Sequence, residues 1–188
     1  MALLTIGSRF GWLLLALALC GAAALPARAA DAPVAQQVKA AYLYKFATYA
    51  EWPAGAFEHA ASPFVIGVAG SDEVAALLAQ FVAGRSVGGH PVEVRLIGRG
   101  DKLAGVHMLY ASGDRALVGE ILAQARGYPV LTVTDSEQAF AQGSMINFVI
   151  ADNKLRFEVA LRRVNTGRLR ISARMLAAAH KVETRIPI

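Results

Sequence analysis

Short apolar runs that alternate with helical stretches constrain the fold of this chain more than any other feature. Residues 64–69 form a near-continuous apolar run, as buried parallel strands do. Ser71 or Asp72 then suits the N-cap of a helix, and apolar residues recur at helical spacing up to Phe81. Further strand patterns lie at 90–97, 106–110 and 129–133, and a helix capped by Asp114 precedes the last of them. This order predicts one α/β domain, a largely parallel sheet flanked by helices on both faces.

Residues 144–159 predict a β-hairpin at one end of this sheet. Two β-rich runs flank the dipeptide Asp152-Asn153, which suits a tight turn. The first run is apolar on both sides, as in a central strand. The second has one polar side, formed by Lys154, Arg156 and Glu158, as in an edge strand. Shorter helical patterns follow at 161–166 and 171–179.

Residues 38–52 predict the first helix of the domain. Its apolar stripe consists of Val38, Ala41, Tyr42, Phe46 and Tyr49, which recur at three- and four-residue spacing and are expected to face the sheet. Tyr44, Thr48 and Glu51 are expected to lie on the opposite side. Pro53 then excludes continuation of the helix.

The first 29 residues have the pattern of a secretory signal peptide. Arg9 precedes the apolar block 11–24, and Ala27-Arg28-Ala29 offers a small-residue cleavage site. The block is short for a membrane span. Cys20 raises a lipoprotein alternative, which Leu19 disfavours because a small residue is expected there. We therefore expect residues 30–188 to be the mature domain, exported from the cytosol.

The cysteine content and the charge distribution exclude some classes of function and favour others. Cys20 is the only cysteine, so the mature chain has neither disulfide nor thiol chemistry. Residues 154–188 carry nine Lys or Arg against two Glu, a net charge of +7, whereas residues 31–153 carry eight basic and twelve acidic residues, a net charge of −4. A basic tail fits an acidic partner or an anionic surface. Export and the lack of interleaved aromatics argue against nucleic acid.

A search for catalytic motifs finds none. The mature histidines His59, His90, His107 and His180 are isolated, so no zinc spacing is present. There is no nucleophile elbow and no P-loop, and Gly67-x-x-Gly70 falls short of a dinucleotide fingerprint. We predict no catalytic residue, no cofactor, no metal and no enzymatic activity.

The chain resembles the YfiR-like family of periplasmic proteins in three stretches. The first is 38–53, a tyrosine-rich helix that runs into Trp-Pro; the others are 130–149 and 155–176. The resemblance implies a secreted α/β domain without catalytic activity. The best-understood member of the family represses an inner-membrane diguanylate cyclase and so controls cyclic di-GMP, biofilm and motility. That member's redox-sensitive cysteine pair has no counterpart here. Ser144 and Ala160 also depart from the residues that are common in the family.

The leading hypothesis is thus a regulatory protein that binds the periplasmic domain of a diguanylate cyclase or sensor kinase, with a homodimer as a further state. The alternatives are a small solute-binding protein for an anionic or aromatic ligand and a hydrolase of envelope material. For the partner-binding residues we predict Tyr44, Lys45, Glu51, Arg170 and Arg174, because tyrosine and arginine often dominate interfaces. Arg170 and Arg174 are expected on one side of the last helix.

Overall fold

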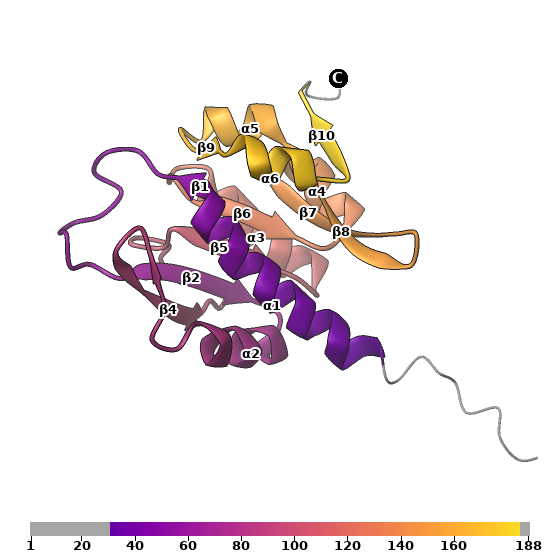
Figure 1. Cartoon of the computed structure of the whole chain (residues 1–188), viewed down its shortest axis with the longest axis horizontal. Helices are drawn as coiled ribbons and strands as arrows, with labels where there is room; N and C mark the ends of the chain where they lie inside the picture. Colours follow the sequence, from indigo (N-terminus) through magenta and orange to yellow (C-terminus); the bar gives the residue numbers. More distant parts are fainter. Residues whose placement is uncertain (1–30, 185–188) are drawn as a thin grey trace, which may run out of the picture. The chain divides into compact units, whose positions relative to one another are not determined.

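The computed structural model describes residues 31–184. The centre of this part of the chain is an eight-stranded sheet (Figure 1). Its strands are β2 (Phe64–Ala69), β3 (Ser86–Val87), β4 (His90–Leu96), β5 (Met108–Ala111), β6 (Leu131–Thr134), β7 (Ile146–Ala151), β8 (Lys154–Ala160) and β10 (Lys181–Glu183). They lie in the order β10-β8-β7-β6-β5-β2-β4-β3. Neighbours from β4 to β7 pair in parallel, so the predicted largely parallel sheet is confirmed.

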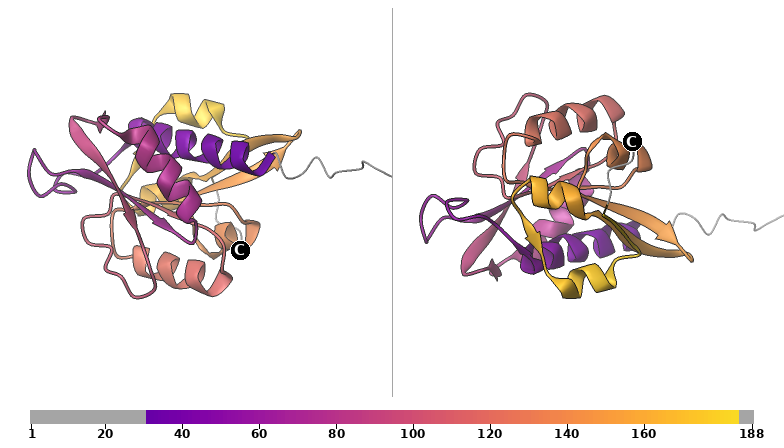
Figure 2. Two further views of the ribbon diagram at one scale, coloured as in Figure 1. Left: turned by 90° about the horizontal axis from the view of Figure 1, so that it is seen from below. Right: turned by 90° about the horizontal axis from the view of Figure 1, so that it is seen from above.

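Helices cover both faces of the sheet, as predicted (Figure 2). They are α1 (Asp31–Tyr49), α2 (Asp72–Val82), α3 (Arg115–Ala125), α4 (Glu137–Gln142), α5 (Leu161–Thr166) and α6 (Ala173–Ala178). One core lies between the sheet and α1, α2, α5 and α6, and includes Leu43, Phe46 and Met175. The other lies under α3 and α4, and includes Ile121 and Ala139. The side chains of Ser71 and Asp114 cap α2 and α3, as their positions predicted.

The hairpin is present, but its second strand is not an edge strand. β7 and β8 pair in antiparallel register, and Asp152 and Asn153 both have positive φ angles, of 51° and 55°. Two positive φ angles define the tight turn that hairpins favour. The polar alternation of β8 predicted an open edge, which is wrong because β10 pairs with it in parallel, opposite residues 158–160. Since β10 has only three residues, its sequence gave too little periodicity to reveal a strand.

Helix α1 follows the predicted stripe in part: Tyr42, Phe46 and Tyr49 pack against the core on the sheet. Its buried residues are Ala40, Leu43, Phe46 and Ala47, whereas Val38 is exposed. Tyr42 and Tyr49 are half-buried. The predicted stripe was incomplete, because it left out Ala40, Leu43 and Ala47, which are buried together with Phe46. The ring of Phe46 packs 4.9 Å from that of Phe157 and stacks on Phe148.

A two-stranded sheet joins the beginning and the end of the described chain. β1 (Ala50–Glu51) pairs in antiparallel register with β9 (Arg170–Ile171). Arg170 therefore lies in a strand before α6, and its predicted helical relation to Arg174 is wrong. Within the described residues, the chain from Pro33 to residue 184 forms one compact unit. In residues 31–184 no helix has both the length and the apolar character of a membrane span. The expected signal peptide and Cys20 lie outside the described residues.

Candidate functional site

A partly buried carboxylate, that of Asp135 at the carboxyl ends of β5 and β6, binds three side chains. Oδ2 of Asp135 accepts hydrogen bonds from Lys39 Nζ at 2.7 Å, Tyr110 OH at 2.7 Å and Ser112 Oγ at 2.8 Å. Tyr110 and Ser112 come from β5 and its end, and Lys39 comes from α1. The Lys39–Asp135 ion pair therefore attaches the first helix to the sheet. Open α/β sheets commonly bind ligands at this end of their strands.

The hydrogen bonds around Asp135 determine its charge. Burial by itself raises the pKa of this carboxyl, but the bonds from Lys39 and Tyr110 outweigh it and hold the pKa below its usual value. Burial, followed by the negative charge of Asp135, raises the pKa of Tyr110. The phenol therefore stays protonated as a donor, and the carboxylate stays ionised as an acceptor.

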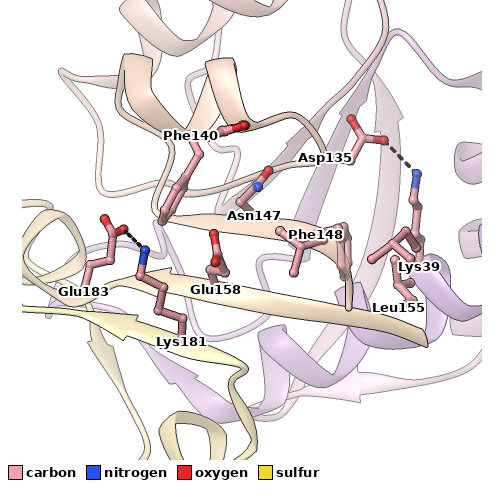
Figure 3. Close-up of a pocket in the computed structure, with 12 residues that line it drawn as sticks. Lys39, Asp135, Phe140, Asn147, Phe148, Leu155, Glu158, Lys181 and Glu183 are labelled. Carbon is pink, nitrogen blue, oxygen red and sulfur yellow. Dashed lines mark hydrogen bonds and ion pairs between the residues drawn. The ribbon is translucent and has the colours of Figure 1, made fainter. Parts of the chain in front are cut away.

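A pocket of about 460 Å³ opens beside this cluster, between α4, the hairpin and β10 (Figure 3). Apolar side chains of the hairpin, including Phe148, Ile150 and Leu155, line one part of it. Charged residues line the rest: Lys39, Asp135, Glu137, Glu158, Lys181 and Glu183. We call this the hairpin pocket. Within residues 31–184 no three His, Cys, Asp or Glu side chains are placed to hold a metal ion.

A second cleft, also of about 460 Å³, lies beside the loop that follows β1. The residues that line this cleft include Trp52, Pro53, Phe57 and His90. The Phe57 ring is sandwiched between His90, at a centroid distance of 3.7 Å, and His107, at 4.3 Å. Trp52 Nε1 donates to the carbonyl oxygen of His107 at 3.0 Å. The Trp-Pro motif thus fastens the loop to the amino end of the sheet.

Histidine 107 also holds this loop through its side chain. The backbone N–H of Val65 donates to Nδ1 at 3.1 Å, so a neutral ring must carry its proton on Nε2, which lies 3.1 Å from the carbonyl oxygen of Ala56. Burial lowers the pKa of His107, and the nearby His90 lowers it further. His107 is therefore a hydrogen-bonded core residue, only 4% exposed.

The predicted partner-binding residues are only partly brought together. Glu51 and Arg170 face each other across the β1–β9 pairing, with Arg170 Nε 3.7 Å from Glu51 Oε2, and both side chains are mostly exposed. Arg174 is exposed on α6 and Lys45 is exposed on α1. Figure 2 shows α1 and α6 on the same face of the sheet.

Tyr44 does not point freely outward as predicted. Its hydroxyl donates to the carbonyl oxygen of Ser86 at 3.2 Å, and its ring contacts Phe81 and the guanidinium of Arg85. The side chain therefore joins α1 to α2 and to the start of β3. A packing role accounts for these contacts without a partner.

The model of the YfiR/HmsC-like family matches residues 36–180. This chain belongs to the YfiR/HmsC-like family. The match extends from α1, across both clefts, to the segment before β10. The matched range therefore contains the Asp135 cluster and both strands of the hairpin, but not β10, which pairs with β8. A search of curated proteins gives no match.

Sequence reasoning missed the Asp135 cluster and the hairpin pocket of this YfiR/HmsC-like domain. No role was predicted for Asp135, which follows the predicted strand at 129–133. A usable signal was present, since Ser112 and Asp135 each follow a predicted parallel strand and such ends meet at one edge of the sheet. Lys39 gave no such signal, because the angle at which α1 crosses the sheet is a property of the folded core.

Proposed function

We propose that this protein is a periplasmic regulator that binds and represses an inner-membrane signalling protein, most simply a diguanylate cyclase. The observation that carries the proposal is the family match over residues 36–180. The signal-peptide pattern of residues 1–29 supports export. The protein acts by binding rather than by catalysis. Its release from the partner would raise cyclic di-GMP and favour biofilm.

The proposed contact surface consists of Lys45, Glu51, Arg170 and Arg174. Three features support it. The four residues come from α1, the β1–β9 pairing and α6, and all are exposed. The Glu51–Arg170 pair is solvated, so it contributes little to folding and its charges stay accessible. Arg170 and Arg174 also belong to the basic segment 154–188, and positive charge of this kind speeds encounter with an acidic partner.

Capture from solubilised inner membranes tests the function. The tagged mature protein should retain a membrane protein with a cyclase or kinase domain, identified by mass spectrometry. Deleting the gene in the native host should raise the level of cyclic di-GMP, and expressing the gene in trans should return that level to the wild-type value. Deletion without any change in cyclic di-GMP, together with capture of no such protein, would refute the proposed function.

Charge reversal tests the surface separately. Arg170→Glu with Arg174→Glu should weaken capture about tenfold or more at low salt, because long-range attraction to an acidic partner is lost. The control, Arg95→Glu with Lys102→Glu, makes the same change of net charge at exposed positions of β4 and the loop after it, and should capture normally. Both variants should keep the melting temperature. Equal capture by the two variants would place the interface elsewhere.

A further inference from the structure

Strand β7 continues beyond the end of its neighbour β6. The pairing of these two strands ends with Thr134 opposite Asn147, whereas β7 extends to Ala151 and stays paired with β8 over that length. From Phe148 onwards, the side of β7 that faces away from β8 is therefore an open sheet edge. An open edge presents unpaired backbone groups to which another extended chain can bind.

The register of the hairpin identifies the open backbone groups. The N–H of Ala160 donates to the carbonyl oxygen of Met145 at 2.8 Å. Because alternate residues of an antiparallel pair bond to the partner strand, the odd-numbered residues of β7 bond to β8, whereas Phe148 and Ile150 face the open edge. In residues 31–184 no strand or loop pairs with the carbonyl oxygen of Phe148 or with the N–H and C=O of Ile150.

The hairpin pocket lies along this edge and reaches both faces of the sheet. Phe148 belongs to the core under α1, and Ile150 and its cross-strand neighbour Leu155 share that face because side chains alternate along a strand. Glu158 points to the other face, which α4 covers and to which Glu137 belongs. Since one cavity has lining residues on both faces, it passes over the open edge of β7. Figure 3 shows Asp135 beyond that edge, on the side of β7 away from β8.

The α1 face of the edge suits aliphatic side chains. Ile150 is 69% exposed although it lies in a strand, and its neighbour across the hairpin is the half-buried Leu155. The charges on this side, Lys39 and Asp135, already form an ion pair with each other. An aliphatic side chain of an added strand would therefore cover apolar surface here, as cross-strand neighbours do within a sheet.

The α4 face of the edge suits basic side chains. It carries Glu137, Glu158 and Glu183 against Lys181, a net charge of −2. Lys181 is paired with Glu183 at 2.8 Å, whereas Glu137 and Glu158 have no ion-pair partner among the described residues. Successive side chains of an extended peptide point to opposite faces. The edge thus favours a peptide in which aliphatic and basic residues alternate.

We propose that the open edge of β7 binds an extended peptide segment of a partner protein as an added strand, with aliphatic side chains on the α1 face and basic side chains on the α4 face. Backbone hydrogen bonds to Phe148 and Ile150 supply affinity, and the alternating side chains supply specificity. The β1–β9 pairing, which carries Glu51 and Arg170, lies at the other end of α1 from the hairpin turn (Figure 1). This inference goes beyond the proposed regulatory function and does not depend on the identity of the cyclase or kinase.

Five-residue peptides with blocked ends test strand addition to the purified mature protein. A peptide of alternating lysine and valine should show saturable binding in calorimetric titration at low salt, and a peptide of alternating glutamate and valine should bind at least tenfold more weakly. N-methylation of the valines removes the backbone donors of one edge of the added strand, and N-methylation of the lysines removes those of the other edge. One of these two methylated peptides should therefore lose binding. Undiminished binding of both would overturn the proposal, as would equal binding of the acidic peptide or no saturable binding of the basic one.

Proline substitution locates the site. Ile150→Pro removes the N–H that faces the open edge and leaves the β7–β8 hydrogen bonds in place, a position at which edge strands tolerate proline. It should weaken binding of the lysine–valine peptide about tenfold. The control is Leu96→Pro on β4, also an exposed aliphatic residue, whose N–H faces away from β2 because that of the next residue, Ile97, donates to Val68. This control should bind like the unaltered protein, and equal affinity of the two variants would refute the site.

Hydrogen exchange gives a measurement on the unaltered protein. Saturating lysine–valine peptide should slow the exchange of the Ile150 amide, followed by nuclear magnetic resonance, and leave that of Leu96 unchanged. An unchanged rate at Ile150 would refute the site. Sedimentation of the peptide-free protein examines a second copy of the chain as occupant: a dimer that Ile150→Pro converts into monomers would overturn the proposal. None of these results bears on capture of the membrane partner.

Discussion

Oδ2 of Asp135 accepts three hydrogen bonds in a partly buried position of the domain. The side chains of Lys39 and Asp135 are only 14% and 18% exposed. An ion pair of this kind is costly to break, because the remaining partner keeps a desolvated charge. Its main structural effect is to fix the position at which α1 crosses the sheet.

Removing the charge of Asp135 should destabilise the fold strongly. We expect Asp135→Asn to lower the free energy of unfolding by roughly 3 kcal/mol, the usual order for one lost member of a buried pair. Glu120→Gln is the control, because it breaks the more exposed contact with Arg99 and should cost less than about 1 kcal/mol. Urea denaturation at pH 7 measures both. Similar losses in the two variants would contradict a special role for the cluster.

The difference in the free energy of unfolding between wild type and Asp135→Asn should depend on pH in a defined direction. The pKa of Asp135 is lowered by folding, so its ionised form stabilises the folded state. That contribution is complete above the ordinary aspartate pKa of about 3.9 and is lost as the pH falls through the folded value. The gap between wild type and Asp135→Asn should therefore be constant between pH 5 and 7 and narrow below about pH 4.

His107 should make the protein sensitive to milder acid. Its pKa is lowered by folding, so the neutral ring stabilises the fold above about pH 6.5, and this contribution is lost as the pH falls through the lower folded value. A protonated ring would also turn an N–H toward the N–H of Val65. The melting temperature of wild type should fall between pH 7 and 5. In His107→Asn the drop should be smaller, whereas His59→Asn, at an exposed position, should behave like wild type.

At the scale of elements, the hairpin turn places two consecutive non-glycine residues at positive φ. Asp152 and Asn153 both adopt positive φ, and both β7 and β8 line the hairpin pocket. β-Branched residues are strained in that region of backbone space, whereas Gly is not. The turn therefore sets the shape of one wall of the pocket.

Substitution at Asn153 tests this constraint. Asn153→Val should destabilise the protein by about 1–2 kcal/mol, while Asn153→Gly should be nearly neutral. Thermal unfolding of the two variants beside wild type gives the comparison. If valine were tolerated as well as glycine, the positive φ at this residue would not be required in solution.

The elements differ in how well their sequences predicted them. Continuous apolar runs such as 64–69 and capped helices such as that after Ser71 carry strong local signals, and these predictions are confirmed. The buried face of α1 was predicted only in part, because Ala40, Leu43 and Ala47 are buried beside Phe46 while Val38 is exposed. β10 and the β1–β9 pairing are too short to show periodicity. Both sites depend on contacts between distant segments, which no local pattern encodes.

For the whole molecule, stability must come from the two cores without covalent help. No cysteine follows Cys20. Thermal melts of the mature protein with and without dithiothreitol should therefore coincide. A shift of several degrees would contradict export and cleavage near Ala29, since only a retained Cys20 could respond. Mass spectrometry of the same sample gives the start of the chain.

The contact between Phe46 and Phe157 has a consequence for how the protein is made. One ring belongs to the first helix and the other to the penultimate strand of the main sheet, so the larger core joins the two ends of the domain. Contacts between such distant segments form slowly, and they cannot form while the later segment is still being synthesised. A growing chain would thus lack its main core until synthesis is nearly complete. Such a delay would keep the polypeptide unfolded during transport across a membrane, so that it folds only after transport.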